Sequence, residues 1–213
     1  MLSVYSGPAG CGRTYLANLF AKNYIDAGQQ ILYVYDTDGR KSVGPYVDTN
    51  PSPRLIPVGL NQAFELIESQ PDVYRWMTKI FDVTTLSESG QSSGMNFNSG
   101  VAQARVEFLQ QYGRDSTVIV FIQSPRAYGD SPRPVGGPIS LTYAAGEIFT
   151  LECQRGENPR IYATNTKNRY GPVGGITASY PVDLKLLGVE AAPYYPTLDG
   201  ALCTKIGLIL MDL

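Results

Sequence analysis

Histidine is absent from this chain of 213 residues, and cysteine is scarce. Without histidine, catalytic triads built on histidine and metal sites with histidine ligands are excluded. The three cysteines, Cys11, Cys153 and Cys203, have no paired spacing. That pattern argues against a zinc site or a disulfide framework and favours a reducing compartment.

Charge and long apolar runs are also in short supply. Charged residues make up 17% of the chain and its net charge is −2, so any nucleic-acid contact must come from a local basic patch. No apolar run approaches the ~20 residues of a membrane span, and we expect no signal peptide before the first strand. The terminal run 206–210 is too short to span a membrane and is typical of a strand. With 43% hydrophobic residues, the composition favours one globular domain over residues 1–213.

The most informative segment is the glycine-rich run Gly7-Pro8-Ala9-Gly10-Cys11-Gly12-Arg13-Thr14. It fits the phosphate-binding pattern G-x-x-x-x-G-K-[ST] except that Arg13 replaces lysine. An apolar run, 1–5, precedes it as a strand would, and a helical pattern over about 13–27 follows. In this arrangement backbone N–H groups close around phosphate oxygens, and Thr14 is placed to ligate Mg²⁺. The alternative is a glycine-rich turn between a strand and a helix.

Arg13 changes the expected chemistry of that loop. Arginine is longer than lysine, planar and permanently charged, so it can bind phosphate bidentately but need not sit as deep in the loop. Nucleotide binding through residues Gly7 to Tyr15 therefore follows more directly from the sequence than fast hydrolysis does.

Strands and helices alternate through the first half of the chain. Strands are expected at 30–35, 54–58, 77–81 and 117–122, and helices at 60–69 and 101–112. Residues 86–100 and 128–138 are rich in turn-forming residues and are expected to be loops. Short strands at 148–154, 160–165 and 176–180 follow. The pattern predicts an α/β fold with a mainly parallel sheet flanked by helices and extended by C-terminal antiparallel hairpins.

Carboxylates end two of the expected strands. Asp82 ends Lys79-Ile80-Phe81-Asp82 and could hold the Mg²⁺ hydration shell, or it could simply cap a loop. Asp36 and Asp38 follow the second strand, which is expected beside the phosphate loop. Either could orient the water that attacks the γ-phosphate, and a plain Asp-Thr-Asp-Gly turn is the alternative.

Two polar segments follow later strands. Gln123 and Ser124 end the central strand, where a polar group can face the γ-phosphate, although such residues also merely terminate strands. Lys167 and Arg169 flank Asn168, and on an extended segment they would point the same way. They could supply charge to a phosphate in a neighbouring subunit, or they could form a solvated turn.

In this order the motifs resemble the RecA/RadA recombinase ATPase core over most of the chain. The phosphate loop, the Asp82 strand and Phe121-Ile122-Gln123-Ser124-Pro125-Arg126 each match a family segment. Pro134-Val135-Gly136-Gly137-Pro138 resembles the Gly-Gly that closes the second DNA-binding loop. Lys167-Asn168-Arg169-Tyr170-Gly171 is very similar to the Lys-Asn-Arg-Phe-Gly motif of RadA. The chain departs from the family at Arg13, at Asp38 in place of glutamate, and at Ser124 in place of the switch glutamine.

The resemblance implies a RecA-like P-loop NTPase core that uses ATP and Mg²⁺. It implies Asp38, Gln123, Lys167 and Arg169 as catalytic residues, and Thr14 and Asp82 at the metal. Single-stranded DNA contacts would come from Phe97, Arg126, Tyr128 and Arg133, unless those segments are surface loops without a ligand. Nucleotide would lie between the subunits of a homo-oligomer. Because the sequence begins at the first core strand, we expect no N-terminal polymerisation extension.

The expected function is ATP-dependent recombination or annealing of single-stranded DNA, with slow ATP hydrolysis. A core of this size resembles phage proteins of this kind, so the expected location is the cytoplasm of a bacterium or of a phage-infected host. One alternative is a nucleotide-binding structural or assembly protein with weakened catalysis. The other is a helicase or branch-migration motor with the same fold.

Overall fold

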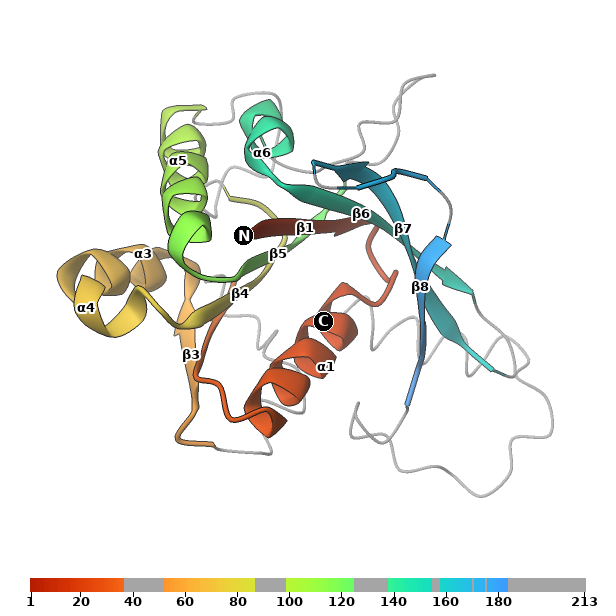
Figure 1. Ribbon diagram of the computed structural model, residues 1–213, viewed down its shortest axis with the longest axis horizontal. Coiled ribbons are helices and arrows are strands. Elements are labelled where there is room, and N and C mark those ends of the chain that lie inside the picture. Colours follow the sequence, from red (N-terminus) through yellow and green to blue (C-terminus); the bar gives the residue numbers. More distant parts are fainter. Residues whose placement is uncertain are drawn as a thin grey trace.

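Eight strands form a single sheet in the order β3-β2-β4-β5-β1-β6-β7-β8 (Figure 1). The computed structural model describes residues 1–36, 52–86, 99–124, 138–154, 158–169, 171–174 and 176–183. The strands are β1 (Leu2–Gly7), β2 (Ile31–Tyr35), β3 (Leu55–Gly59), β4 (Thr78–Val83), β5 (Val118–Gln123), β6 (Glu147–Gln154), β7 (Arg160–Asn168) and β8 (Ile176–Pro181). The helices are α1 (Arg13–Asp26), α3 (Leu60–Ser69), α4 (Pro71–Tyr74), α5 (Ser99–Asp115) and α6 (Ile139–Ala144).

The first six strands of the sheet order run parallel, and the last two are antiparallel additions. β1 pairs in parallel with β5 and β6, and β4 pairs in parallel with β2 and β5. β7 is antiparallel to β6, and β8 is antiparallel to β7. This arrangement confirms the predicted α/β sheet with C-terminal hairpins. It also gathers the carboxyl ends of β1, β2, β4 and β5 at one edge, here called the loop edge.

Helices cover both faces of the sheet (Figure 1). One apolar core joins Val4, Phe81 and Val120 to buried residues of α3, α5 and α6. The other joins Tyr5, Ile80 and Phe121 to Leu16 and other residues of α1. Successive residues of β1, β4 and β5 therefore enter opposite cores. Because the strands are buried on both faces, they appear as continuous apolar runs in the sequence.

Three features of the sequence-based picture are corrected by the structure. β2 does not lie beside the phosphate-loop strand, because β4 and β5 stand between them. The short helices α4 and α6 are additions to the predicted elements. β7 continues to Asn168, so Lys167 belongs to a strand rather than to the segment after it. The helix α3, in contrast, has the predicted bounds.

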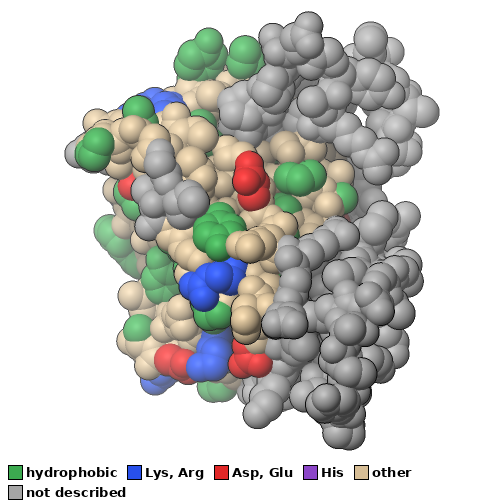
Figure 2. Space-filling model, turned by 90° about the vertical axis from the view of Figure 1, so that its right-hand side faces the viewer, with side chains coloured by type: hydrophobic (Ala, Val, Ile, Leu, Met, Phe, Trp, Pro, Cys, Tyr) green, Lys and Arg blue, Asp and Glu red, His purple; other side chains and the backbone are tan. Residues whose placement is uncertain are grey.

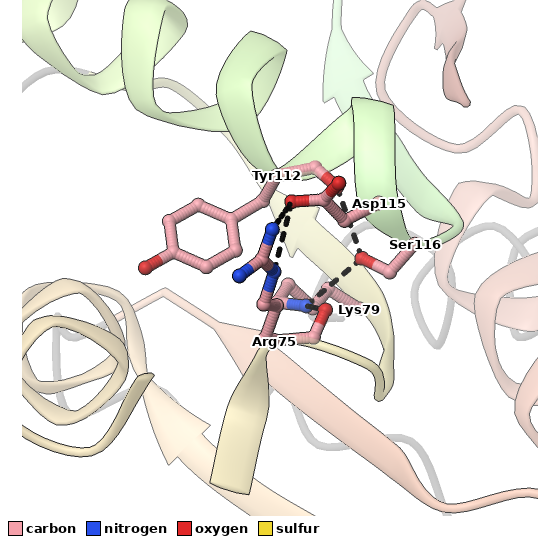
Figure 3. A network of polar contacts seen from close by, with 5 residues as sticks. All are labelled: Arg75, Lys79, Tyr112, Asp115 and Ser116. Carbon is pink, nitrogen blue, oxygen red and sulfur yellow. Dashed lines mark hydrogen bonds and ion pairs between the residues drawn. The ribbon is translucent and has the colours of Figure 1, made fainter. Parts of the chain in front are cut away.

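A buried lysine lies at the edge of the sheet opposite the loop edge (Figure 3). Lys79, near the start of β4, has no exposed surface. Its Nζ donates to the carbonyl oxygen of Met77 at 3.0 Å and to Ser116 Oγ at 3.0 Å, and it lies 5.2 Å from the centre of the Tyr112 ring. Burial lowers the pKa of Lys79 to about 8, although the charge of Asp115 acts in the other direction.

Within the described ranges, none of the helices has the length and apolar character that crossing a membrane requires.

Candidate nucleotide site

The glycine-rich loop connects the end of β1 to the start of α1. A turn inside it is closed by the Cys11 N–H, which donates to the Pro8 carbonyl oxygen at 3.2 Å. Gly10 and Gly12 have φ of 76° and 88°, a conformation that favours glycine. A Cβ at Gly7 would lie 2.4 Å from Cys11 Sγ and 3.0 Å from the Leu151 carbonyl oxygen. The glycines are therefore required by the path of the loop.

The loop delivers uncapped backbone donors at the N-terminus of α1. Gly12 is the N-cap residue, no side chain caps the helix, and its first turn holds no acidic residue. The first N–H groups of a helix have no intrahelical partner, and together with the helix dipole they favour an anion. A glycine loop with this helix start fits a phosphate group of a nucleotide.

Cys11 inside the loop is a packing residue. Its side chain is buried, and burial raises the pKa of the thiol to about 11 in spite of the Arg13 charge nearby. A thiol with such a pKa is protonated at neutral pH and is a poor nucleophile. Cys11 and Cys153 are both free thiols.

Thr14 and Asp82 come together, as the magnesium prediction requires. Asp82 ends β4 in a buried position and is hydrogen-bonded by the Thr14 side chain. Burial raises the pKa of Asp82 to about 6, and the charge of Arg13 with the hydrogen bonds from Thr14 and Tyr33 offsets part of that effect. At neutral pH the carboxylate is therefore ionised and beside a hydroxyl, a donor pair that suits Mg²⁺ and its water shell.

Two polar residues that the sequence analysis missed support this pair. Tyr33 OH donates to Asp82 Oδ2 at 3.1 Å, and Asn18 Nδ2 donates to the Tyr33 oxygen at 3.1 Å. Asn18 Nδ2 also donates to the Thr14 carbonyl oxygen at 2.7 Å. Because Tyr33 lies in an apolar strand and Asn18 inside a helix, neither pattern signals a polar network.

Arg13 points across the sheet edge to two neighbouring strands. Its Nη1 donates to the Val83 carbonyl oxygen at 3.2 Å, and its Nη2 donates to Gln123 Oε1 at 3.3 Å. Arg13 thus connects the phosphate loop to the ends of β4 and β5. Gln123 was predicted to face the nucleotide, and it lies in register with Gly7.

Asp36 lies at the same edge. Its Oδ2 accepts hydrogen bonds from the Thr84 N–H at 2.8 Å and the Thr84 Oγ1 at 2.6 Å, and its charge acts to raise the pKa of Asp82. Asp36 therefore ties the end of β2 to the residue that follows β4. Asp38, the other candidate acid, lies outside the described residues, as do Phe97, Arg126, Tyr128 and Arg133.

Tyr15 has its side chain directed away from the loop. Its hydroxyl donates to the Pro181 carbonyl oxygen at 3.0 Å and accepts from the Asp183 N–H at 2.8 Å. The Tyr15 side chain thus fastens α1 to the end of β8.

Lys167 and Arg169 do not join the other site residues. Lys167 pairs with Ile148 at the start of β6, and the neighbouring Glu147 pairs with Ser3 near the start of β1. The two cations therefore lie at the edge opposite the loop edge. Both donate to the Tyr143 carbonyl oxygen, and Lys167 donates also to that of Ala145 at 2.8 Å, so they share one side as alternate residues of a strand should.

The comparisons bear on the fold. No protein-family model and no curated protein sequence matches the chain. Among solved structures, the chain is similar to the ATPase domain of a replicative helicase, with a TM-score of 0.54 and 15% sequence identity. The similarity covers 81% of this chain and 78% of that chain.

The fold is RecA-like. In this RecA-like sheet β5 stands between β1 and β4, so Gly7, Gln123 and Asp82 lie side by side on three neighbouring strands. The sheet order thus assembles the phosphate loop, the acidic residue and the polar strand end without a contribution from β7 or β8.

Charge on the described surface is sparse. Figure 2 shows the face on the β8 side, where acidic and basic side chains are scattered singly among polar and apolar surface. Groups of three or more potential metal-ligating side chains are absent from the described part of the chain. A divalent cation at Thr14 and Asp82 would therefore depend on phosphate oxygens and water for its other ligands, as Mg²⁺ commonly does.

Proposed function

We propose that this protein is a RecA-like ATPase, a single domain over residues 1–213, that binds ATP and Mg²⁺ and acts on single-stranded DNA as a motor. The observation that carries the proposal is the convergence of Gly7–Thr14, Asp82 and Gln123 at the loop edge. The similarity to an ATPase domain over 81% of the chain supports ATP as the nucleotide.

The residues divide the work by chemistry. The N–H groups from Gly10 to Thr14 would hold the phosphates, the Thr14 hydroxyl would ligate Mg²⁺, and Asp82 would hold water of the metal shell. The metal neutralises charge on the β and γ phosphates when it is bound. Asp38 is the proposed water-orienting acid. Asp36 is the alternative, although its Oδ2 is already engaged by Thr84.

Lys167 and Arg169 are proposed to act on the nucleotide of a neighbouring subunit. β1 from Leu2 to Gly7 separates their edge from the loop edge, and at about 3.3 Å per residue that is well beyond the reach of a side chain. A head-to-tail contact would place this edge of one protomer on the loop edge of the next. The two cations would then complete the site in trans, as an arginine finger does.

DNA contacts are proposed for the segments that follow β4 and β5. They contain Phe97, Arg126, Tyr128 and Arg133, which combine aromatic stacking groups with cations. Both segments begin at the loop edge, so nucleotide and DNA would be close to one another. Recombination or annealing is the second candidate activity, and it is favoured by the Lys167-Asn168-Arg169-Tyr170-Gly171 segment.

The test measures ATP turnover with and without single-stranded DNA, and then unwinding and annealing of labelled duplexes. DNA-stimulated turnover with unwinding supports the motor. Stimulated turnover with annealing or strand exchange and no unwinding supports the second candidate. Nucleotide binding without turnover under any condition would overturn both and favour an assembly protein.

A further inference from the structure

Arg13 and Gln123 form a direct side-chain pair between the phosphate loop and the end of β5. The Nη2 donor of Arg13 lies 3.3 Å from Gln123 Oε1, while the Nη1 donor lies 3.2 Å from the Val83 carbonyl oxygen. The guanidinium is thus held by acceptors on two adjacent strands, at a distance of 70 residues in sequence from one and 110 from the other.

A second connection holds the same strand end to the other side of the loop. The Ser124 N–H donates to the Gly7 carbonyl oxygen at 2.9 Å, and Gln123 is in register with Gly7. Residues 123 and 124 are therefore fastened to both ends of the phosphate loop. A change in the position of Arg13 is transmitted directly to the strand end.

An arginine is suited to this double role in a way that a lysine is not. The guanidinium presents five N–H donors in a planar fork, and two of them are used by Val83 and Gln123. The remaining donors are available to phosphate oxygens. The lysine ammonium is a single point with a shorter reach, so it cannot span two strands and a phosphate with fixed geometry.

We propose that Gln123 positions the Arg13 fork, and that the pair makes the loop prefer a nucleoside triphosphate over a diphosphate. This inference rests on the proposed nucleotide-binding function. Arg13 contacts the terminal phosphate, and Gln123 is a positioning residue that acts through Arg13. Its Oε1 is engaged by the guanidinium, so its contribution disappears when Arg13 is replaced.

A double-mutant cycle tests the pair. The proteins are the wild type, Arg13→Lys, Gln123→Met and the double variant, with Gln123→Glu as the conservative control that keeps an acceptor oxygen. Calorimetry gives the dissociation constants for a non-hydrolysable ATP analogue and for ADP, both with Mg²⁺. The readout is the ratio of the two constants, which a loss of general stability does not change.

We expect Gln123→Met to lower the preference for the triphosphate analogue about tenfold when Arg13 is present, and less than about twofold in the Arg13→Lys background. Gln123→Glu should retain the preference. Equal losses in both backgrounds would show that Gln123 contacts phosphate by itself, and no loss in either would show that the bond is only structural. Both results overturn the inference while leaving nucleotide binding intact. A wild type that binds neither nucleotide would overturn the proposed function as well.

Discussion

At the scale of single residues, β4 carries two ionisable groups that burial affects differently. Asp82 is compensated by hydrogen bonds from Thr14 and Tyr33 and by the Arg13 charge, so its carboxylate remains available near neutral pH. Lys79 is surrounded by carbonyl oxygens, the Ser116 hydroxyl and the Tyr112 ring. Its charged form is therefore less favourable in the folded protein than in water.

This difference predicts a pH dependence of stability. The folded pKa of Lys79 is about 8 against 10.5 for the free side chain, so between these values the unfolded state binds more protons. The free energy of unfolding should therefore rise with pH, by about 2 kcal/mol between pH 7 and 10. Urea unfolding of the wild type and of Lys79→Met should differ by this amount across the window.

Above pH 10 the raised pKa values of Tyr33 and Tyr180 act in the opposite direction, so the comparison is limited to the lower range. Because the same tyrosines are present in both proteins, the difference between them isolates Lys79. Parallel stability profiles of the wild type and the variant would contradict this account.

At the scale of elements, the loop depends on the packing of α1 against β7. Gly12 precedes α1 with a φ of 88°, and a Cβ there would lie 2.3 Å from Ile161 Cδ1 on β7. The chain path at the phosphate loop is therefore constrained both by backbone conformation and by a neighbouring strand.

Gly12→Ala should destabilise the protein by about 1–3 kcal/mol, because it adds left-handed strain to a steric clash. Ile161→Ala in the same chain should remove the clash but not the strain. Thermal unfolding and nucleotide titration of the single and double variants measure both parts. A fully stable Gly12→Ala protein would contradict the described loop geometry.

The sequence predicted most of the elements because their patterns are strong. The strands β1, β4 and β5 are buried on both faces and appear as apolar runs, and α3 has clear helical periodicity. α4 and α6 contain 4 and 6 residues, too few to show a period. Strand order is decided by tertiary packing, so the neighbours of β2 were not predictable from the chain alone.

The candidate site was predicted in part for the same reason. Gly7–Thr14 is a local motif and Asp82 ends a recognisable strand, so both could be identified from sequence. The Tyr33–Asp82 and Arg13–Gln123 bonds join residues far apart in the chain. Such pairs depend on which strands become neighbours, which sequence patterns do not encode.

At the scale of the whole molecule, the phosphate loop and the Lys167–Arg169 pair occupy opposite edges of one sheet. A single protomer therefore cannot use both on one nucleotide. Repeated head-to-tail contact would instead join every loop to the cations of a neighbour, in a ring or a helical filament. Nucleotide that bridges protomers would also promote their assembly.

Subunit mixing tests this arrangement. Thr14→Ala and Lys167→Ala/Arg169→Ala should each be inactive, because each lacks one half of every site. In an equal mixture, roughly a quarter of randomly formed interfaces would join an intact Thr14 to intact cations, so turnover should return in part. No recovery, together with monomers at every ATP concentration by light scattering, would contradict the trans arrangement.

The central claim is that the loop edge binds a magnesium nucleotide through Thr14. Calorimetric titration of the wild type, Thr14→Ala and Thr14→Ser with Mg²⁺ and a non-hydrolysable ATP analogue tests it most directly. The account predicts saturable binding by the wild type and by Thr14→Ser, which keeps the hydroxyl, and weakening of about 10- to 100-fold for Thr14→Ala that is much smaller when Mg²⁺ is omitted. No binding by the folded wild type, or equal affinities for all three proteins, would contradict it.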